Sequence, residues 1–413
     1  MERVLVTGMG AVSCLGAGLD ALWRGLGTAR SEPVKIGDPH VNCAVPIMYR
    51  IPDDAVPQGP ASHTGAPLGL TSRLAATAAR EAVLDAAVRP TDPSRVAVVV
   101  GTAMGDHRLR EQRRAARLFP PDADRASRGA VAEPAAEDCT DYVAAAVVAE
   151  ELGGHGPVTV VANACAASGY AVAIAADMIR SGEVDVALVG GADSYSRVAL
   201  ANFNRMGAID PERCRPFDAR RKGTVFGEGA AFVVLEAESH AEHRGATQVY
   251  ARVRGTGWSC DGYHLTAPEP GGAQIAAAMQ RALAEARVRP DEVACVVPHG
   301  TGTELNDIVE SEALRAVFGG HCEDLPLYSG KAMLGHTAGG AGAFSVIIAA
   351  MILRHGAVPP NRPLDGPDER CPVWLPDRAQ PVAGRYALAN AYAFGGNNVS
   401  VLLETVSMEG RPS

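Results

Sequence analysis

The stretch VTVVANACAASGYAVAIAADMIR, residues 158–180, indicates how this chain folds. Its first five residues are mostly β-branched and follow a Gly-Pro pair, which predicts a buried strand. Residues 168–180 are apolar on nearly all sides, which is typical of a helix inside a protein core. Cys165 lies at the turn between strand and helix, where free N–H groups and the helix dipole favour a thiolate. Cys165 is therefore a candidate nucleophile, although a lone cysteine is more often a small buried hydrophobe.

Four segments of the first half recur in the same order in the second half. Residues 3–10 resemble 251–257, 95–102 resemble 292–301, 171–179 resemble 344–352, and 231–236 resemble 399–404. One such match would mean little in an α/β chain, but four ordered matches indicate a duplicated unit. We therefore expect two α/β halves, residues 1–250 and 251–413, with the apolar helices at 168–180 and 342–354 sandwiched between two sheets.

The composition is that of an acidic α/β protein. The chain has 413 residues, of which 47% are hydrophobic and 21% charged, and its net charge is −9. A negative charge argues against nucleic-acid binding. Nine cysteines without a CxxC pair predict reduced thiols in a cytoplasm, and neither a disulfide framework nor a zinc site. The apolar run at 343–353 is too short to cross a membrane, so we expect no membrane association.

The second half adds two histidines and a lysine, each just after an expected strand. His299 follows the strand at 292–297, while Lys331 and His336 follow a short strand at 325–328. By the internal repeat, His336 lies near the position that Cys165 holds in the first half. We therefore expect the two central helices to bring the thiol and this imidazole together. A nucleophile beside imidazoles and a cation is suited to acyl transfer with charge stabilisation.

Two acidic residues and a glycine turn complete the candidate site. Asp307 and Glu310 are three residues apart, so they share one face of a helix expected at 304 to about 318. Acidic residues in a first helical turn are commonly only dipole partners. The turn Phe394-Gly395-Gly396 precedes a final strand at 399–404, and we expect its backbone N–H groups to face the same pocket.

Two other motifs point elsewhere, but only weakly. Gly8-Met9-Gly10 after a strand imitates a dinucleotide-binding loop, yet Ser13 replaces the third glycine and no acidic residue follows at the expected distance. His240 and His243 have a spacing that metal ligands use. They lie in a charged stretch, however, which is more typical of a solvated helix face.

Taken together, the motifs resemble those of the β-ketoacyl-acyl-carrier-protein synthases, condensing ketosynthases of the thiolase fold. The resemblance runs from Val4 to Glu404 and is weakest over 104–141, a charged segment that we expect to be an exposed insertion. It is carried by six motifs in the family order: NACAAS at 163–168, RPFD at 215–218, FGEGA at 226–230, HGTGT at 299–303, GKAMLGH at 330–336 and AFGGNN at 393–398. The segment TELND at 303–307 resembles the ketosynthases of type II polyketide systems more than those of fatty-acid synthesis.

The resemblance implies a thiolase-like fold of two duplicated halves in five α-β-α-β-α layers, and a Cys-His-His site. Cys165 would take an acyl chain from an acyl carrier protein as a thioester. A malonyl-carrier thioester would then lose CO₂, and its carbanion would attack that acyl group. His299 and His336 would donate hydrogen bonds to the malonyl thioester carbonyl. Lys331 would support the two histidines electrostatically.

The resemblance also implies supporting roles and partners. Asp307 and Glu310 would hold the network around Lys331. The backbone N–H groups of Cys165 and Phe394 would form an oxyanion hole, and the Phe394 ring would gate acyl entry. No metal or organic cofactor is required, because the phosphopantetheine arm belongs to the carrier protein. The partners would be that carrier and a second subunit, in a homodimer or in a heterodimer with a chain-length-factor-like subunit that has lost its cysteine.

Some positions depart from the family pattern and leave the pocket shape open. Asn163 and Asn397 stand where threonine is usual, Pro298 precedes His299, and Gly330 precedes Lys331. None of these changes removes a catalytic group.

Alternative activities on this scaffold stay open. A non-condensing acyltransferase would use Cys165 without decarboxylation. A non-catalytic chain-length partner is disfavoured because Cys165, His299 and His336 are all retained. A thiolase would need a second cysteine near the C-terminus, but the last one, Cys371, precedes Phe394.

A basic cluster is the candidate docking site for the acidic carrier. It comprises Arg213, Arg215, Arg220, Arg221 and Lys222, and a second set of arginines lies at 108–117. We expect Arg220 and Arg221 to contact the carrier protein. The alternative is that these side chains form internal salt bridges or a solvated loop.

Overall fold

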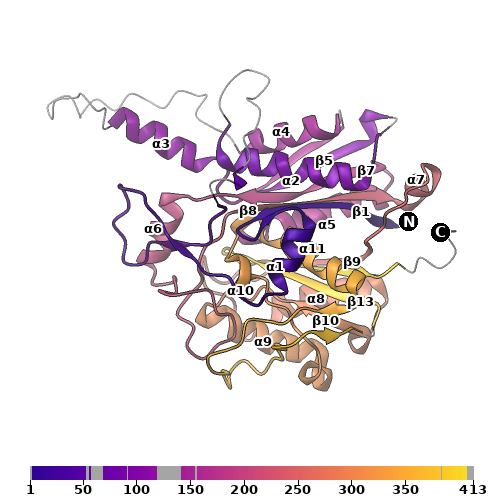
Figure 1. Cartoon of the computed structure of the whole chain (residues 1–413). Helices are drawn as coiled ribbons and strands as arrows, with labels where there is room; N and C mark the ends of the chain where they lie inside the picture. The colour runs from indigo at the N-terminus through magenta and orange to yellow at the C-terminus, as the bar shows by residue number, and fades with distance from the viewer. Residues whose placement is uncertain are drawn as a thin grey trace.

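Strands from the two halves of the chain form the framework of the molecule (Figure 1). The computed structural model describes residues 2–52, 55–56, 68–90, 92–118, 141–153, 156–382 and 384–406. In the first half, the strands lie in the order β6 (Val158–Val161), β5 (Val96–Gly101), β7 (Val186–Asp193), β8 (Gly229–Ala237) and β1 (Val4–Ser13). In the second half, the order is β10 (Val293–Val297), β13 (Tyr386–Tyr392), β14 (Asn397–Glu404) and β9 (Ala251–Cys260).

The strand order confirms the predicted duplication. The paths β1-β8-β7-β5 and β9-β14-β13-β10 match strand for strand, and both contain the segments that the sequence comparison paired. The halves meet where β1 pairs antiparallel with β9, Val4 opposite Val253 and Val6 opposite Ala251. Both paths also mix parallel and antiparallel neighbours in the same places, because β5–β7 and β10–β13 are parallel while β7–β8 and β13–β14 are antiparallel.

Helices between and outside the strands complete the five layers of a thiolase-like fold. Helices α5 (Ala167–Arg180) and α11 (Ala341–His355) lie in the middle (Figure 1). Helices α2 (Leu70–Ala86) and α4 (Tyr142–Leu152) cover the first half, and α8 (Ala273–Ala286) and α9 (Glu304–Phe318) cover the second. Three separate apolar cores fill the spaces between these layers, since each layer buries an apolar face against the next.

The two central helices touch through glycine. A Cβ atom on Gly342 would lie 2.4 Å from the backbone nitrogen of Gly169, so no larger residue fits there. The close approach places the N-termini of α5 and α11 side by side. Cys165 precedes the first of these N-termini and His336 precedes the second.

The remaining elements are short and lie around this framework. They are β2 (Gly16–Ala17), α1 (Leu19–Leu26), β3 (Val34–Lys35), β4 (Ile47–Met48), α3 (His107–Leu118), α6 (Arg197–Arg205), α7 (Glu238–His243), α10 (Lys331–Leu334), β11 (Ala357–Val358) and β12 (Gln380–Pro381). Helix α3 accounts for part of the expected insertion at 104–141, and residues 119–140 of it lie outside the described residues.

Two expectations were wrong, one about the burial of a strand and one about the length of an apolar helix. Strand β6 is not fully buried: Val158 is 48% exposed and Thr159 is also exposed, because among the described strands β6 is the outermost and pairs with β5 alone. The apolar run around 343–353 is longer than expected. Within the described residues, the helical stretch Ala338–His355 is long and apolar enough to span a membrane by length and composition, but 89% of it is buried inside the molecule. It is the central core helix.

Candidate active site

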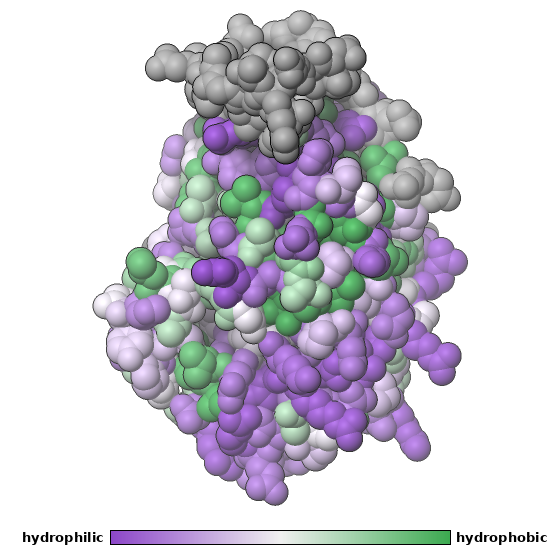
Figure 2. Space-filling view, turned by 90° about the vertical axis from the view of Figure 1, so that its left-hand side faces the viewer, coloured by the Kyte–Doolittle hydropathy of each residue, from purple (hydrophilic) through white to green (hydrophobic). Residues whose placement is uncertain are grey.

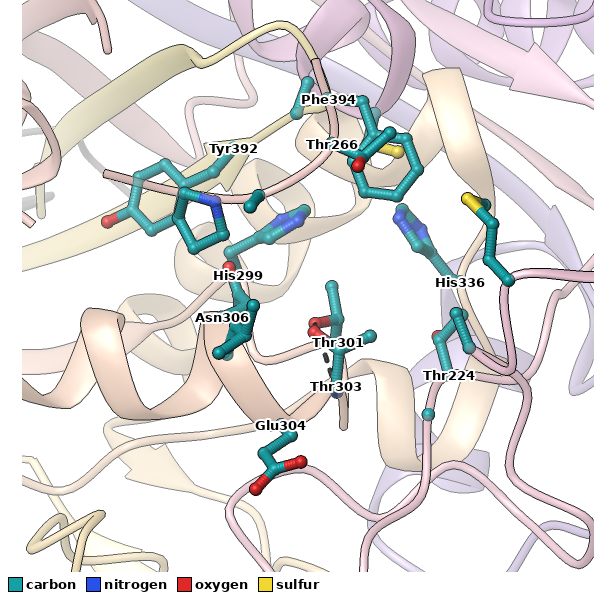
Figure 3. A pocket seen from close by; sticks show the side chains of 18 of the residues that line it. Thr224, Thr266, His299, Thr301, Thr303, Glu304, Asn306, His336, Tyr392 and Phe394 are labelled. Atoms are coloured by element: carbon teal, nitrogen blue, oxygen red, sulfur yellow. Dashed lines mark hydrogen bonds between the residues drawn. The ribbon is translucent and has the colours of Figure 1, made fainter. Parts of the chain in front are cut away.

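A cavity of about 540 Å³ brings together three residues that are far apart in the sequence. Cys165, His299 and His336 all line it, together with Phe394. His299 and His336 point toward one another across the cavity, with Phe394 on one side and Thr301 and Thr303 on the other (Figure 3). The ring centroids of the two histidines are 5.6 Å apart, and the rings are nearly perpendicular at 84°. The predicted convergence of thiol and imidazoles is therefore what the fold produces.

Cys165 lies in a strained turn at the start of α5. A short 3₁₀ helix, Ala164–Ala166, leads into α5, and Ala164 has a φ of +47°, a left-handed conformation that is unusual for alanine. Cys165 as a whole is 9% exposed. Burial raises the pKa of Cys165 from 9.0 to about 12, against the opposing charge of Lys331. The expectation that the helix N-terminus favours a thiolate is therefore wrong for the resting site, where burial dominates and the sulfur keeps its proton.

His336 is a neutral donor. Its Nδ1 accepts a hydrogen bond from the backbone N–H of Ala338 at 3.2 Å, so the ring proton is on Nε2. Burial and the charge of Lys331 lower its pKa well below 6.5. The imidazole therefore offers an uncharged N–H group to the cavity.

Lys331 holds His299 as a neutral imidazole with its proton on Nε2, as in His336. The ammonium Nζ lies 3.4 Å from His299 Nδ1 and donates to the His299 carbonyl oxygen at 2.5 Å. An ammonium has only donors, so the nearby Nδ1 is the acceptor and the ring proton is on Nε2. Burial, followed by the Lys331 charge, lowers the pKa of His299 well below 6.5. Lys331 itself is buried behind the cavity and does not line it.

Glu310 and Asp307 hold the loop that carries His299. Glu310 accepts from the backbone N–H groups of His299 and Gly300, both at 2.7 Å. Asp307 accepts from those of Thr301, Gly302 and Phe217. Burial raises the pKa of Glu310 and lowers that of Lys331, while the two charges attract each other. The main contacts of these carboxylates are thus with backbone N–H groups.

Phe394 lines the cavity and is held by aromatic contacts. Its ring stacks on Phe203 of α6, with centroids 5.3 Å apart and planes 9° apart. Phe203 in turn meets Phe226 edge-on at 4.7 Å, and Phe226 stacks on His336 at 6.2 Å. Among the described residues, no backbone oxygen accepts a hydrogen bond from the N–H of Phe394, whereas the N–H of Cys165 faces its own sulfur. The Phe394 N–H is therefore available to a ligand.

Comparison with known families agrees with this geometry. Residues 63–241 match the family described as "Beta-ketoacyl synthase, N-terminal domain", and residues 250–365 match "Beta-ketoacyl synthase, C-terminal domain". The chain belongs to the β-ketoacyl synthase family. Nodulation protein E of Rhizobium meliloti is 33% identical over 98% of this chain and 100% of its own length. The tetracenomycin polyketide synthase ketoacyl synthase alpha subunit of Streptomyces glaucescens is 32% identical over 97% of each chain.

Solved ketosynthases share the fold over nearly the whole chain. The ishigamide ketosynthase/chain length factor aligns with a TM-score of 0.85 and 34% identity, covering 98% of this chain and 100% of the other. A type II polyketide acyl-carrier protein in complex with its ketosynthase bound to the hexaketide gives a TM-score of 0.85 and 25% identity, with the same coverage. This protein is thus a β-ketoacyl synthase with the thiolase-like architecture of that family.

Arg221 of this β-ketoacyl synthase does not lie on an open docking surface. Its side chain is 1% exposed, pairs with Asp368 at 2.6 Å, and donates to the backbone oxygens of Asp218 and Thr303. The predicted carrier contact at Arg221 is therefore wrong, because burial and ion pairing already use its guanidinium. Arg213 and Arg215 are likewise paired, both with Asp365. Arg220 and Lys222 are exposed.

Two residues of the synthase site escaped the sequence analysis. Phe203 gave no signal, since an aromatic residue on an amphipathic helix is ordinary. Asp193 gave one that was missed: it ends the otherwise apolar strand β7, and a carboxylate there must find buried partners.

Proposed function

We propose that this β-ketoacyl synthase catalyses a decarboxylative Claisen condensation. An acyl thioester on Cys165 would react with malonyl-acyl-carrier protein to give a β-ketoacyl-acyl-carrier protein, in a type II polyketide or fatty-acid-like pathway. One observation carries the proposal. Both imidazoles have their Nδ1 atoms engaged, so both present a neutral Nε2–H to the cavity that holds the thiol.

In the first step, the Cys165 sulfur attacks the carbonyl carbon of an acyl-carrier thioester. A C–S bond forms to Cys165, the bond to the carrier sulfur breaks, and the thiol proton passes to the departing carrier thiolate. Because burial holds the thiol protonated, the proton must leave as the new bond forms. The backbone N–H groups of Cys165 and Phe394 would stabilise the oxyanion.

In the second step, the malonyl thioester oxygen accepts hydrogen bonds from Nε2–H of His299 and of His336. The electrons of the bond to the carboxylate move into the thioester as CO₂ leaves, giving an enolate. Two neutral donors suit this step, since they stabilise the developing negative charge without transferring a proton. The enolate carbon then attacks the acyl carbonyl, the C–S bond to Cys165 breaks, and the departing sulfur takes up a proton from solvent to restore the resting thiol.

The remaining site residues position these groups. Lys331 fixes the proton of His299 on Nε2, while Glu310 and Asp307 hold the backbone of the histidine loop. The work is divided between the halves: residues 1–250 supply the nucleophile, and residues 251–413 supply the histidines and the lysine. Phe394 gates the acyl chain, supported by its stacking on Phe203.

The acyl groups arrive on the phosphopantetheine arm of a carrier protein, so the synthase needs no resident cofactor. The carrier docks on the face that carries α6, where apolar patches lie among hydrophilic residues (Figure 2). Met206, 46% exposed, and Lys222 line the cavity there, and Arg205 and Arg220 are exposed nearby in the sequence. In the described part of the chain, no carboxylate pairs with Arg205, Arg220 or Lys222. These cations are therefore available to an acidic partner.

The protein works in the cytoplasm with a second subunit, either identical or like a chain-length factor. The exposed outer strand β6 supports this arrangement, because an unpaired strand edge can pair with another chain. The ketosynthase/chain length factor among the similar structures is a precedent.

Intact mass and product analysis test the proposal. Native enzyme with defined acyl- and malonyl-carrier proteins should release CO₂ and form a β-ketoacyl-carrier product. Cys165→Ala should form no acyl-enzyme, while Cys260→Ala, which removes an exposed thiol, should form it normally. His336→Ala should keep the acyl-enzyme but lose decarboxylation. Acyl transfer without CO₂ release would instead identify a non-condensing acyltransferase.

A further inference from the structure

The turn that carries Cys165 has a twin in the second half. A left-handed alanine, a 3₁₀ turn and a central helix follow one another at Ala164–Ala167 and again at Ala338–Ala341. The φ angles of the two alanines are +47° and +46°. The residues before them, Asn163 and Thr337, have φ/ψ of −97°/44° and −81°/25°. Two backbones with the same conformation aim their N–H groups in the same way, and Gly339 occupies the position of Cys165.

The twin turn already binds an anion. The backbone N–H of Gly339 donates to Asp193 Oδ2 at 2.6 Å. Asp193 is fully buried and accepts three further hydrogen bonds, from the Thr102 hydroxyl at 2.8 Å and from the backbone N–H groups of Ala103 and Met104, both at 2.9 Å. A carboxylate without a cation is stable in such a place only when its oxygens are saturated with donors.

The carboxylate also comes from the equivalent place in the chain. In the first half, Asp193 of β7 lies opposite Gly229 of β8. The internal repeat matches Gly229 with Asn397 of the second half. Asn397 is bonded to Ala393, since its backbone oxygen accepts from the Ala393 N–H. Asp193 thus corresponds to Ala393, the neighbour of the gate residue Phe394. In the first half, the mirrored position lies between Cys165 and this second-half segment, both of which line the cavity. In the second half, the Asp193 carboxylate occupies the corresponding position beside the Gly339 N–H.

We infer that Asp193 is an internal stand-in for the substrate oxyanion, and that it acts as a positioning residue for His336. The link is short. Asp193 holds the N–H of Gly339, and the preceding N–H, that of Ala338, donates to His336 Nδ1 and keeps the ring proton on Nε2. The inference rests on the proposed function, since it assigns a reason for the donor geometry of His336 in the decarboxylation step.

The Asp193 carboxylate also affects Cys165, but there it makes the catalytic group less reactive. The charge of Asp193 raises the pKa of Cys165, while Lys331 lowers it, and the neutral His299 and His336 face the same cavity. Removing the Asp193 charge should therefore make the thiol more reactive. Loss of the hydrogen bond from the Gly339 N–H to Asp193 should make His336 a poorer donor.

The test is Asp193→Asn, measured in two half-reactions on one enzyme sample. Acylation of Cys165 by acyl-carrier protein should be unchanged or faster, and the pH profile of its alkylation by iodoacetamide should shift to lower pH. Decarboxylation of malonyl-carrier by the acylated enzyme should fall about tenfold or more in kcat, with KM changed less than about threefold. The ratio of the two rates is independent of the folded fraction.

Two further variants keep the test decisive. Thr102→Val removes the hydroxyl that donates to Asp193 Oδ1, so Asp193 should be held less firmly, and decarboxylation should fall without slower acylation. Glu236→Gln removes a buried carboxylate at the far end of β8, which Arg244 and His240 bind, and should leave the ratio unchanged. Equal losses in both half-reactions, or no loss in either, would overturn the role of Asp193. Native enzyme that never decarboxylates malonyl-carrier would instead overturn the proposed function.

Discussion

Replacing Lys331 with methionine tests the proposed site most directly. Methionine keeps the volume and removes the ammonium that lies 3.4 Å from His299 Nδ1 and donates to the His299 carbonyl oxygen. A hydrogen bond from a charged donor contributes about 1.5–3 kcal/mol, which corresponds to a roughly 10- to 150-fold loss of rate if it acts in the decarboxylation step. Without the nearby cation, the pKa of His299 should also rise, although burial keeps it below its ordinary value.

The assay combines kinetics with spectroscopy. Carbon dioxide release from malonyl-carrier protein gives the rate, and NMR titration of the imidazole resonances gives the His299 pKa. Lys35→Met, which removes an exposed lysine of β3, is the matched control and should change neither.

Removing a buried charge can also unfold a protein, here because Glu310 loses the attraction of Lys331. The double variant Lys331→Met/Glu310→Gln removes both charges, so it should fold better while still losing activity. A folded Lys331→Met enzyme that decarboxylates at the native rate would refute the reasoning, and so would an unchanged His299 titration.

Three other outcomes are expected. Phe203→Leu loses a ring stack worth about 0.5–1.5 kcal/mol, so alkylation of Cys165 by iodoacetamide should accelerate about two- to tenfold; an unchanged rate would show that Phe203 does not hold the gate closed. Arg221→Ala should lower the free energy of unfolding by about 3–5 kcal/mol because it breaks a buried ion pair, whereas Arg220→Glu should leave it unchanged and raise the KM for carrier protein; the reverse pattern would restore Arg221 as a docking residue. Since burial raises the pKa of Cys165 to about 12, its alkylation rate should climb about tenfold per pH unit between about pH 7 and 10, while protonation of His336 should not limit decarboxylation down to about pH 6.5 because its pKa lies well below that value. Burial raises the pKa of Glu310 to about 7, so a loss of rate in this range should come from that carboxylate. A thiolate plateau near neutral pH, or an acid limb near pH 6.5 that persists in Glu310→Gln, would contradict these assignments.

Local sequence patterns predicted the elements that carry the site. The strand-turn-helix around Cys165, the helix at 304–318 and the repeated segments were all readable, because periodicity and turn chemistry act over a few residues. The burial of β6 was misjudged for the same reason. A run of valines has the same pattern at the edge of a sheet as at its centre, and only the neighbouring strands distinguish the two.

The charge state of each group depended on contacts between distant segments. Arg220 and Arg221 are adjacent and chemically identical, yet one is exposed and the other is buried against Asp368, 147 residues away. The helix N-terminus suggested a thiolate at Cys165, but desolvation by surrounding layers outweighs it. The carboxylate at the end of β7 could be seen in the sequence, but its partner Gly339, in the other half, could not.

By itself, then, the sequence determined the duplicated α/β architecture and the kinds of residue that do the chemistry, since backbone periodicity and residue type are local properties. Tertiary structure alone decided which nitrogen of each histidine carries the proton, which arginines are free, and whether the sulfur is charged. Those properties follow from dielectric and hydrogen-bond partners, and both are supplied by residues that meet only when the two halves pack around their shared pair of helices.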